Sequence, residues 1–272
     1  EYPDMVGCLS TSKSPQQMFG VVSKTYFAEK LGVSPDRIYS VSIMPCMAKK
    51  AEKDIKTIND SGVGKDVDLV LTTRELCRLI KRENINIAMM EESEFDSPLG
   101  CSSGAGVIFG TTGGVMEAAL RTAYYKLTGV NPEPDQFEQI RNGAPWREAS
   151  LSIAGTKVRI AVVSGLSNTR ALLEALRRGE VSYDFVEVMA CPGGCVGGGG
   201  QPIHDGEEWA ERRAKVLYDL DARNEIRFSH ENPEIQALYK EYLKEPLSHK
   251  AEALLHTDHT SWEVSTMYEQ IR

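Results

Sequence analysis

The stretch that most constrains the fold runs from Glu187 to Pro202, EVMACPGGCVGGGGQP. Two cysteines, Cys191 and Cys195, stand among six glycines, directly after a run from Tyr183 to Ala190 that we interpret as a buried strand. Thiolates are soft ligands that suit iron-sulfur clusters, zinc and copper(I), and glycines let the backbone fold closely around a bulky inorganic group. The stretch therefore predicts a metal site at the end of a strand.

A further ligand is needed, because two cysteines rarely hold a cluster alone. Cys46 in MPCMAKKAE is the best candidate, since it follows a β-branched apolar run, Ile38 to Met44, that predicts another strand. Both motifs thus stand at the carboxyl ends of predicted strands, where open α/β sheets bind their ligands. We expect Cys46 to converge with Cys191 and Cys195 on one pocket, although 145 positions separate Cys46 from Cys191.

Each cysteine motif belongs to a predicted βαβ unit, which should be right-handed with parallel strands. We predict an α/β fold with two lobes of mainly parallel βαβ units facing a shared cleft, plus a helical C-terminal tail. The first unit is predicted as strand Ile38 to Met44, helix Ala48 to Ile58 and strand Val67 to Thr72, with a further helix opening at Thr72. The second is predicted as strand Val158 to Ser164, helix Asn168 to Arg178 and strand Tyr183 to Ala190.

The remaining segments are assigned by their local patterns. Ser14-Pro15-Gln16-Gln17 predicts a helix start with a capping box, and five apolar residues after it predict a buried face: Met18, Phe19, Val22, Tyr26 and Phe27. Gly104-Ala-Gly with Gly110 has the spacing GxGxxxG and no strand before it, so we favour a closely packed loop over a dinucleotide site. Asn131 to Ser150 is interpreted as a surface connection.

Composition excludes several classes of protein. A net charge of -8 without a concentrated basic patch argues against nucleic-acid binding. No run approaches the roughly 18 apolar residues of a membrane span. Six cysteines do not make a disulfide framework in a chain of 272 residues, and Cys77 is predicted to be a small core residue.

Several segments together resemble one known family. LSTSKSPQQMFG, MPCMAKKAE, SSGAGVIFGTTGGVMEAALR and EVMACPGGCVGGGGQP are similar to signature segments of the FeFe hydrogenases and occur in the same order. The closing PLSHKAEALLHT resembles the small-subunit segment of that family. The resemblance covers nearly the whole chain. It implies a catalytic domain over residues 1–205, N-terminally incomplete, and a helical small-subunit-like tail over 206–272 that packs on it through Trp209, Leu217, Leu238 and Tyr242.

The resemblance also implies a cofactor and a reaction. The cofactor would be the H-cluster, a 4Fe-4S cluster bridged to a two-iron subsite, and the reaction the reversible interconversion of protons plus electrons and dihydrogen. Cys46, Cys191 and Cys195 would be three of the four cluster ligands, with Cys195 as the bridge. The implied catalytic residues are Ser10, in a proton relay, and Lys49, beside a cyanide ligand. Residues implied to lie around the cofactor are Ser14, Gln16, Met44, Pro45, Glu52, Met189 and Gly194, and Glu52 would steady Lys49.

Further expectations follow from the family pattern. Its first signature begins with a Thr-Ser-Cys-Cys-Pro-type segment that carries the fourth ligand and a proton-transferring cysteine, and this segment is not among the 272 residues. We therefore expect these residues alone not to turn over hydrogen. The resemblance implies partners of two kinds, ferredoxin or NADH-linked electron-transfer subunits and hydrogenase maturation proteins. A cytoplasmic location is expected.

Two alternatives stay open. Nar-type iron-sulfur assembly factors share the Met-Pro-Cys and Cys-x-x-x-Cys segments but act as non-catalytic scaffolds. The Ser-Gly-Ala-Gly segment, the Gly-Gly-Gly-Gln-Pro ending and the small-subunit-like tail favour the hydrogenase. The second alternative is a zinc-stabilised binding domain that uses Cys46, Cys191 and Cys195 as ligands.

Overall fold

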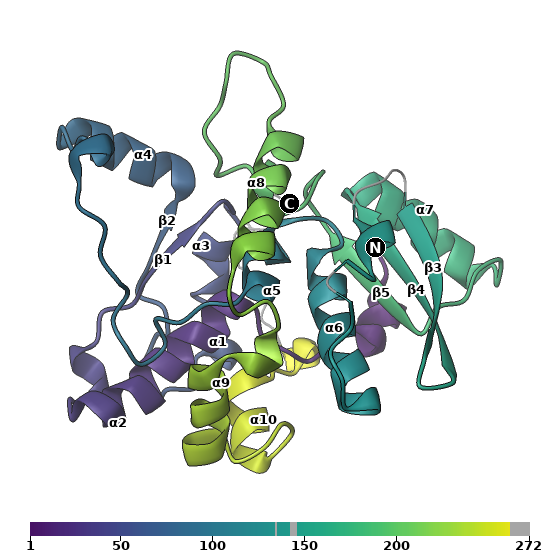
Figure 1. The fold of residues 1–272 in the computed structure, drawn as a ribbon, viewed down its shortest axis with the longest axis horizontal. Coiled ribbons are helices and arrows are strands. Elements are labelled where there is room, and N and C mark those ends of the chain that lie inside the picture. The colour runs from purple at the N-terminus through teal and green to yellow at the C-terminus, as the bar shows by residue number, and fades with distance from the viewer. Residues whose placement is uncertain (134, 142–145, 262–272) are drawn as a thin grey trace, which may run out of the picture. The chain divides into compact units, whose positions relative to one another are not determined.

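The computed structural model describes residues 1–133, 135–141 and 146–261 (Figure 1). The chain forms two compact units, the first made of residues 1–90 and the described residues from 237 onward, and the second of residues 91–236. The boundary at 236 falls inside helix α9 (Pro233–Leu238). Each unit has a sheet of its own, and each sheet contains a parallel strand pair. The prediction of an α/β fold with parallel βαβ units is therefore confirmed.

The first unit is built on two parallel strands, β1 (Val41–Met44) and β2 (Leu69–Thr72), in which Met44 lies opposite Thr72. Its helices are α1 (Pro15–Val22), α2 (Ala28–Leu31), α3 (Lys49–Glu52), α4 (Thr73–Arg82), the end of α9, and α10 (His249–Leu255). The Thr72 hydroxyl and the Glu75 carboxylate form a complete capping box at the start of α4, as the sequence predicted.

The predicted helix from Ala48 to Ile58 is wrong in length, because α3 ends at Glu52 and only a 3-10 turn follows at Lys56–Ile58. The side-chain amide of Asn59 explains the early end. It donates to the carbonyl oxygens of Lys53, at 3.1 Å, and Ile55, at 2.7 Å. These bonds satisfy carbonyls that a longer helix would have used internally.

Helix α1 begins where predicted, and Val22 and Tyr26 are buried as predicted, but the prediction of a buried Phe19 is wrong. Ser14 caps the helix by accepting from the Gln17 amide, whereas the Gln17 side chain donates to the carbonyl of Ile58 and does not complete a capping box. Phe19 is 55% exposed, while Gly20 is buried. A Cβ at Gly20 would lie 2.8 Å from the Asp66 carbonyl oxygen. The glycine face of α1 therefore packs against the segment before β2, and Phe19 is turned outward.

The second unit contains a three-stranded sheet in the order β3 (Trp146–Ile153), β4 (Thr156–Ser164), β5 (Phe185–Met189). Helix α7 (Leu166–Arg177) connects the parallel strands β4 and β5. Strand β3 pairs antiparallel to β4 through a tight turn at Ala154 and Gly155, both with positive φ. The interpretation of the whole of 131–150 as a surface connection is wrong, because β3 begins inside it.

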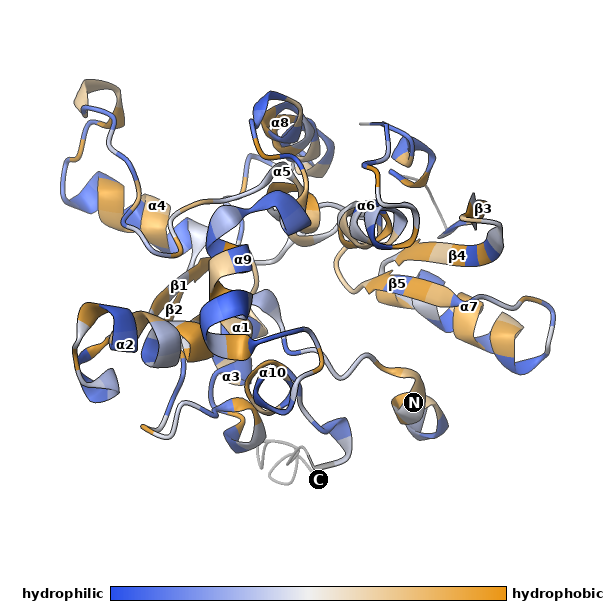
Figure 2. Ribbon diagram, turned by 60° about the horizontal axis from the view of Figure 1, so that its bottom comes forward, coloured by the Kyte–Doolittle hydropathy of each residue, from blue (hydrophilic) through white to orange (hydrophobic). Residues whose placement is uncertain are grey.

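The core of this unit follows from the alternation of side chains along β4. Ile160 and Val162 point to one face and pack with Met116 and Leu120 of α6 (Gly114–Thr128). The intervening residues of β4, Ala161 and Val163, pack with Leu172 of α7 on the other face. The sheet is thus covered on both faces by helices, and β4 is coloured mainly as hydrophobic in Figure 2.

Buried charges join α6 to α8 (Ala210–Arg223). The Arg121 guanidinium donates to both oxygens of Asp221, at 2.9 and 2.8 Å, and to Glu117 at 2.7 Å. These three side chains are at most 1% exposed. Arg141 also donates to the Glu117 carboxylate, and Arg227 donates to the Asp221 carboxylate. Burial opposes ionisation of Asp221, but the hydrogen bonds from the two arginines outweigh it and hold its pKa below the usual value.

The tail packs on the rest of the chain within each unit. Helix α8 packs on α5 (Gly104–Val107) in the second unit, and α10 packs on α1 in the first. Of the four side chains expected to make the contact, Leu238 is buried, and Trp209, Leu217 and Tyr242 are half-buried. Positions 262–272 of the predicted tail lie outside the described residues. Across the part of the chain that the structure describes, no helix combines the length and the hydropathy needed to cross a membrane.

We expect Arg121→Met to destabilise the second unit by ~3–5 kcal/mol, because the substitution removes one member of a buried ionic network and leaves charge uncompensated. Equilibrium unfolding in urea measures the change. Arg178→Met is the control, since the Arg178–Glu180 pair is more than half exposed and its loss should leave the urea unfolding midpoint nearly unchanged. Equal effects of the two variants would contradict a structural role for the network.

Candidate metal centre

In the second unit, Cys191 and Cys195 stand in a tight turn directly after β5. Gly193 and Gly194 both have positive φ, 79° and 92°. The Gly194 amide donates to the Cys191 carbonyl at 3.0 Å, and a 3-10 turn begins at Cys195. Two successive residues in the left-handed region require glycine, which explains the sequence Cys-Pro-Gly-Gly-Cys.

The same turn lies directly on the loop that precedes α6. A Cβ at Gly194 would lie 2.7 Å from the Thr112 nitrogen and 2.9 Å from the Gly110 carbonyl oxygen. The Thr112 amide donates to the Gly193 carbonyl at 3.2 Å. The residues from Gly110 to Thr112 thus pack closely against the cysteine turn, as the sequence predicted for this segment. The prediction of a loop is wrong for Gly104–Val107, which forms helix α5.

Ser164, the last residue of β4, also holds the cysteine turn. Its hydroxyl accepts from the Gly193 amide at 2.9 Å and is 3.4 Å from the Cys191 carbonyl oxygen. The Thr112 hydroxyl lies 3.3 Å from the Ser164 hydroxyl. Sequence reasoning missed Ser164, although its position at the end of a strand parallel to the one that leads to the cysteines was a usable signal.

Glu187 fixes the loop before α6 from the strand side. Its carboxylate accepts from the amides of Gly113, at 2.6 Å, and Met116, at 2.7 Å, so it caps a helix whose own N-cap is a glycine. Burial raises the pKa of Glu187, and the amide hydrogen bonds only partly offset that effect. The cap thus connects β5, which leads into the cysteine turn, to the start of α6.

In the first unit, Cys46 lies between the end of β1 and the start of α3. Met44 is the last residue of β1, and Pro45 separates it from Cys46. Cys46, Cys191 and Cys195 are each half-buried, and none of the six cysteines is in a disulfide. Cys77 is half-buried on α4.

Four of the predicted site residues form one network next to Cys46. The Lys49 ammonium and the Ser14 hydroxyl both donate to the Glu52 carboxylate. The Gln16 side chain donates to the Lys49 carbonyl at 3.2 Å and accepts from the Ser42 hydroxyl at 2.8 Å. The side chains of Lys49 and Glu52 are 19% and 16% exposed. Glu52 therefore pairs with Lys49, as its spacing in the sequence predicted.

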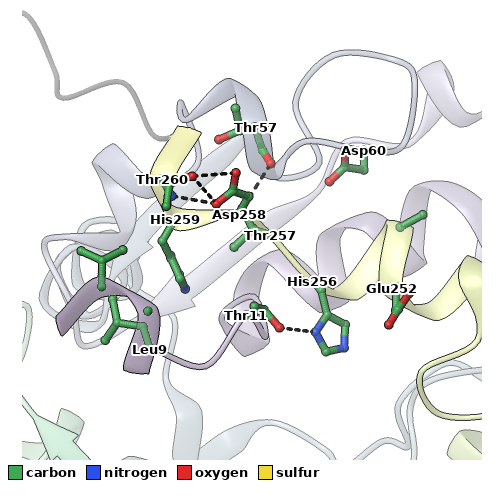
Figure 3. A pocket seen from close by; sticks show the side chains of 13 residues that line it. Leu9, Thr11, Thr57, Asp60, Glu252, His256, Thr257, Asp258, His259 and Thr260 are labelled. Atoms are coloured by element: carbon green, nitrogen blue, oxygen red, sulfur yellow. Dashed lines mark hydrogen bonds between the residues drawn. The ribbon is translucent and has the colours of Figure 1, made fainter. Parts of the chain in front are cut away.

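Ser10 lies apart from this network, in an exposed segment before α1. Its carbonyl accepts from His259 at 2.7 Å, and the neighbouring Thr11 hydroxyl is 2.8 Å from the Nδ1 atom of His256. The two histidines thus make packing contacts between the tail and the N-terminal segment. A pocket of about 540 Å³ opens beside these contacts, lined by Thr11, Asp60, His256 and His259 among others (Figure 3).

The proposed ligands are divided between the two units. Cys46 belongs to the first, and Cys191 and Cys195 belong to the second. Neither unit, in its described residues, contains a group of three or more His, Cys, Asp or Glu side chains that could hold a metal ion by itself. The convergence of the three cysteines stays a prediction.

Two family models match the chain in succession. The "Iron only hydrogenase large subunit, C-terminal domain" matches residues 1–199, and the "Iron hydrogenase small subunit" matches residues 207–262. These segments divide the chain differently from the two compact units, because the second segment contributes to both. The chain belongs to the FeFe hydrogenase family.

Individual relatives agree with this assignment. The NADP-reducing hydrogenase subunit HndD of Solidesulfovibrio fructosivorans is 48% identical over 94% of this chain and 44% of its own length. Cytosolic iron-sulfur assembly component 3 of Mus musculus is 35% identical over 92% of this chain and 53% of its own length. A solved structure of a variant of the FeFe hydrogenase HydA1 from Chlamydomonas reinhardtii matches with a TM-score of 0.79, at 40% identity, over 94% of this chain and 71% of that one. The chain thus spans about half the length of the two sequence relatives.

The cysteine turn should be specifically intolerant of a side chain at Gly194. We expect Gly194→Ala to destabilise the second unit by ~2–5 kcal/mol, because positive φ costs an L-residue about 1–2 kcal/mol and the clash with backbone adds about 1–3 kcal/mol. Gly179→Ala is the control, since Gly179 also has positive φ, 70°, but open space around its Cβ position. Urea unfolding and the alkylation rate of Cys191 measure the effect. Equal losses in the two variants would show that the close approach to Thr112 does not constrain the turn.

The Glu187 carboxyl should titrate above its ordinary value of 4.5, and the Asp221 carboxyl below 3.8. Protonation of Glu187 then stabilises the fold, and this contribution is lost as the pH rises through its folded pKa. The contribution of Asp221 has the opposite sign and is lost as the pH falls through its folded pKa. Carbon NMR titration of the side-chain carboxyls measures both. A pKa below 4.5 for Glu187 would show that its amide hydrogen bonds outweigh burial.

Proposed function

We propose that the chain is the catalytic domain of an FeFe hydrogenase, which interconverts protons plus electrons and dihydrogen. The observation that carries the proposal is the half-buried network of Lys49, Glu52, Ser14 and Gln16, in which Lys49 follows Cys46 by three residues. An iron-sulfur scaffold needs only ligands. An ammonium held at a fixed place beside a ligand cysteine is suited to a further task, the binding of an anion.

The three cysteines are proposed to bind a 4Fe-4S cluster, with Cys195 bridging it to a two-iron subsite. Two features of the residues fit such a group: the cysteines are half-buried without disulfides, and the turn that carries Cys191 and Cys195 is held against the Gly110–Thr112 backbone, where a side chain at Gly194 would not fit. When bound, the cofactor would supply the redox chemistry and the site of hydrogen activation.

The other predicted site residues have supporting roles in this proposal. Lys49 would hold a cyanide ligand with the N–H groups that it does not give to Glu52, because an ammonium has three donors. Met44 and Met189, each the last residue of a strand, would pack on the two-iron subsite with Pro45 and Gly194. Ser14 and Gln16 would fix Glu52 and the start of α3. Ser10 would pass protons through its hydroxyl, which accepts from the Ser12 amide at 3.3 Å.

Electron-transfer subunits are the proposed partners, together with the proteins that mature the cofactor. The similarity to a subunit named for NADP reduction supports a partner that carries electrons between the cluster and a nicotinamide, and a ferredoxin is the other candidate. A cytoplasmic location agrees with this proposal.

A second candidate function is iron-sulfur cluster assembly without catalysis. The 35% identity to a cytosolic iron-sulfur assembly component favours it, although the identity to the hydrogenase subunit is higher, at 48%. Both functions use the cysteines as iron ligands. They differ in whether a two-iron subsite is present.

The cysteine ligands can be tested by reconstitution with iron and sulfide. We expect Cys46→Ser, Cys191→Ser and Cys195→Ser each to lose most of the bound iron and sulfide, because a serine hydroxyl does not replace a soft thiolate. Cys77→Ser on α4 is the control and should bind as much as the unchanged chain. Full iron and sulfide in the three variants would contradict the assignment, and stoichiometric zinc with no iron would favour a zinc-binding domain.

The same preparation tests catalysis. Once a two-iron precursor is added, hydrogen evolution with a strong reductant should require a chain that also carries a Thr-Ser-Cys-Cys-Pro-type segment, because the 272 residues supply three of the four proposed ligands. Comparable turnover from the 272 residues alone would contradict that ligand count and would assign a ligand role to Cys8 or Cys101.

A further inference from the structure

Lys13 is buried in the first unit, one residue before the cap of α1. Its side chain is 0% exposed, and its ammonium is paired with Asp60. The ammonium also donates to the carbonyl of Leu254 at 2.7 Å, in the last turn of α10. A buried ammonium is costly unless it is paired, so its partners have to stay in place. Lys13 therefore joins three segments: the residues before α1, the loop before β2 and the end of α10.

The backbone next to Lys13 is paired with the closing segment of the chain. The Lys13 amide donates to the Leu255 carbonyl at 2.9 Å, and the Thr257 amide donates to the Thr11 carbonyl at 2.8 Å. Ser12 and His256 form an antiparallel bridge between these bonds. Residues 255–257 thus pair antiparallel with residues 11–13, and Figure 3 shows the adjoining contact of Thr11 with His256.

This anchored segment leads directly into the network beside Cys46. Ser14 follows Lys13, caps α1 and donates to Glu52, which pairs with Lys49. A single peptide unit joins Lys13 to Ser14. Displacement of Lys13 would therefore move the Ser14 hydroxyl away from Glu52. The tail is therefore connected to Lys49 through a continuous series of hydrogen bonds, ion pairs and one peptide bond within one unit.

We propose that Lys13 is a positioning residue, through which docking of the tail segment 254–257 sets the place of Ser14, Glu52 and Lys49. Its importance for hydrogen turnover rests on the proposed function, whereas the positioning itself does not. Lys13 needs no contact with substrate or cofactor to act in this way.

The chain offers a matched control in Lys24. Its side chain is also buried, at 4% exposure, and is also paired with an aspartate, Asp68, at 2.8 Å and a backbone carbonyl, that of Lys65. Lys24 follows α1 in the same unit, but its partners, Lys65 and Asp68, belong to the segment before β2 and not to the tail. Lys13→Met and Lys24→Met therefore remove the same kind of interaction, and only the former removes a side-chain bond to residues 254–257.

The test uses the chain without metal, so that its outcome does not depend on the proposed function. We expect Lys13→Met to speed amide hydrogen exchange at position 13, Gln17 and Thr257 by about tenfold or more, and to raise the acylation rate of the Lys49 amine. Lys24→Met should leave these sites unchanged at a similar loss of stability in urea.

Equal effects of the two variants at Lys49 would overturn the proposal and reduce Lys13 to a stabilising residue. Should Lys13→Met fail to fold, Asp60→Asn removes the ion pair while keeping the bond to Leu254, and the same sites should respond, to a smaller degree. No response at Gln17 and Lys49 in a folded Asp60→Asn protein would also overturn it. Absence of a two-iron subsite from the loaded protein would refute the proposed function alone.

Discussion

The pairing of Arg121 with Asp221 is the contact on which the second unit depends. It joins α6 to α8 across 100 positions of sequence, with both side chains almost fully buried. Buried charges tolerate little rearrangement, because every displacement leaves one of them unpaired. With α6 held at its middle by Arg121 and at its start by the Glu187 carboxylate, the loop before it has a fixed place. The Cys191–Cys195 turn rests on that loop.

In each unit, the segment that carries the proposed ligands is held by directional polar contacts. In the second unit, Ser164 and Thr112 bond to Gly193. In the first, Gln16 bonds to the Lys49 carbonyl, and Ser14 to Glu52. Directional bonds suit a site that has to keep ligand atoms at defined places, because apolar packing tolerates sliding more readily. The tail is connected to the contacts of the first unit through Lys13, which bonds to Leu254 and precedes Ser14.

Sequence patterns predicted the elements whose signals are local. The capping box at Thr72 and the Lys49–Glu52 pair depend on residues three positions apart, and both are found as predicted. The parallel pairing of β4 with β5 follows from the βαβ pattern. The Ser14 cap of α1 was predictable for the same reason, because it belongs to a short motif, whereas the contacts of Ser164, Thr112 and Glu187 around the cysteine turn were not predicted.

What the sequence did not reveal depends on distant partners. Phe19 is apolar at a helical position that predicts burial, yet Gly20 approaches the Asp66 carbonyl too closely for that face to be turned any other way. Glu187 is a charged residue within a strand, and its purpose becomes visible only with α6 beside it. Strand β3 is a different case, because the sequence did carry its signal: Ala149, Leu151 and Ile153 alternate with Ser150 and Ser152, as is typical of a half-buried strand.

The central claim is that Cys46, Cys191 and Cys195 hold a cluster bridged to a two-iron subsite and that Lys49 binds an anionic ligand of that subsite. Infrared spectroscopy of the full-length protein, produced together with hydrogenase maturation proteins, tests it most directly. The account predicts bands from metal-bound carbon monoxide and cyanide, with the cyanide bands shifted in Lys49→Met and unshifted in Lys50→Met. A protein with full iron and sulfide content but no such bands would contradict the account and identify the chain as an assembly scaffold.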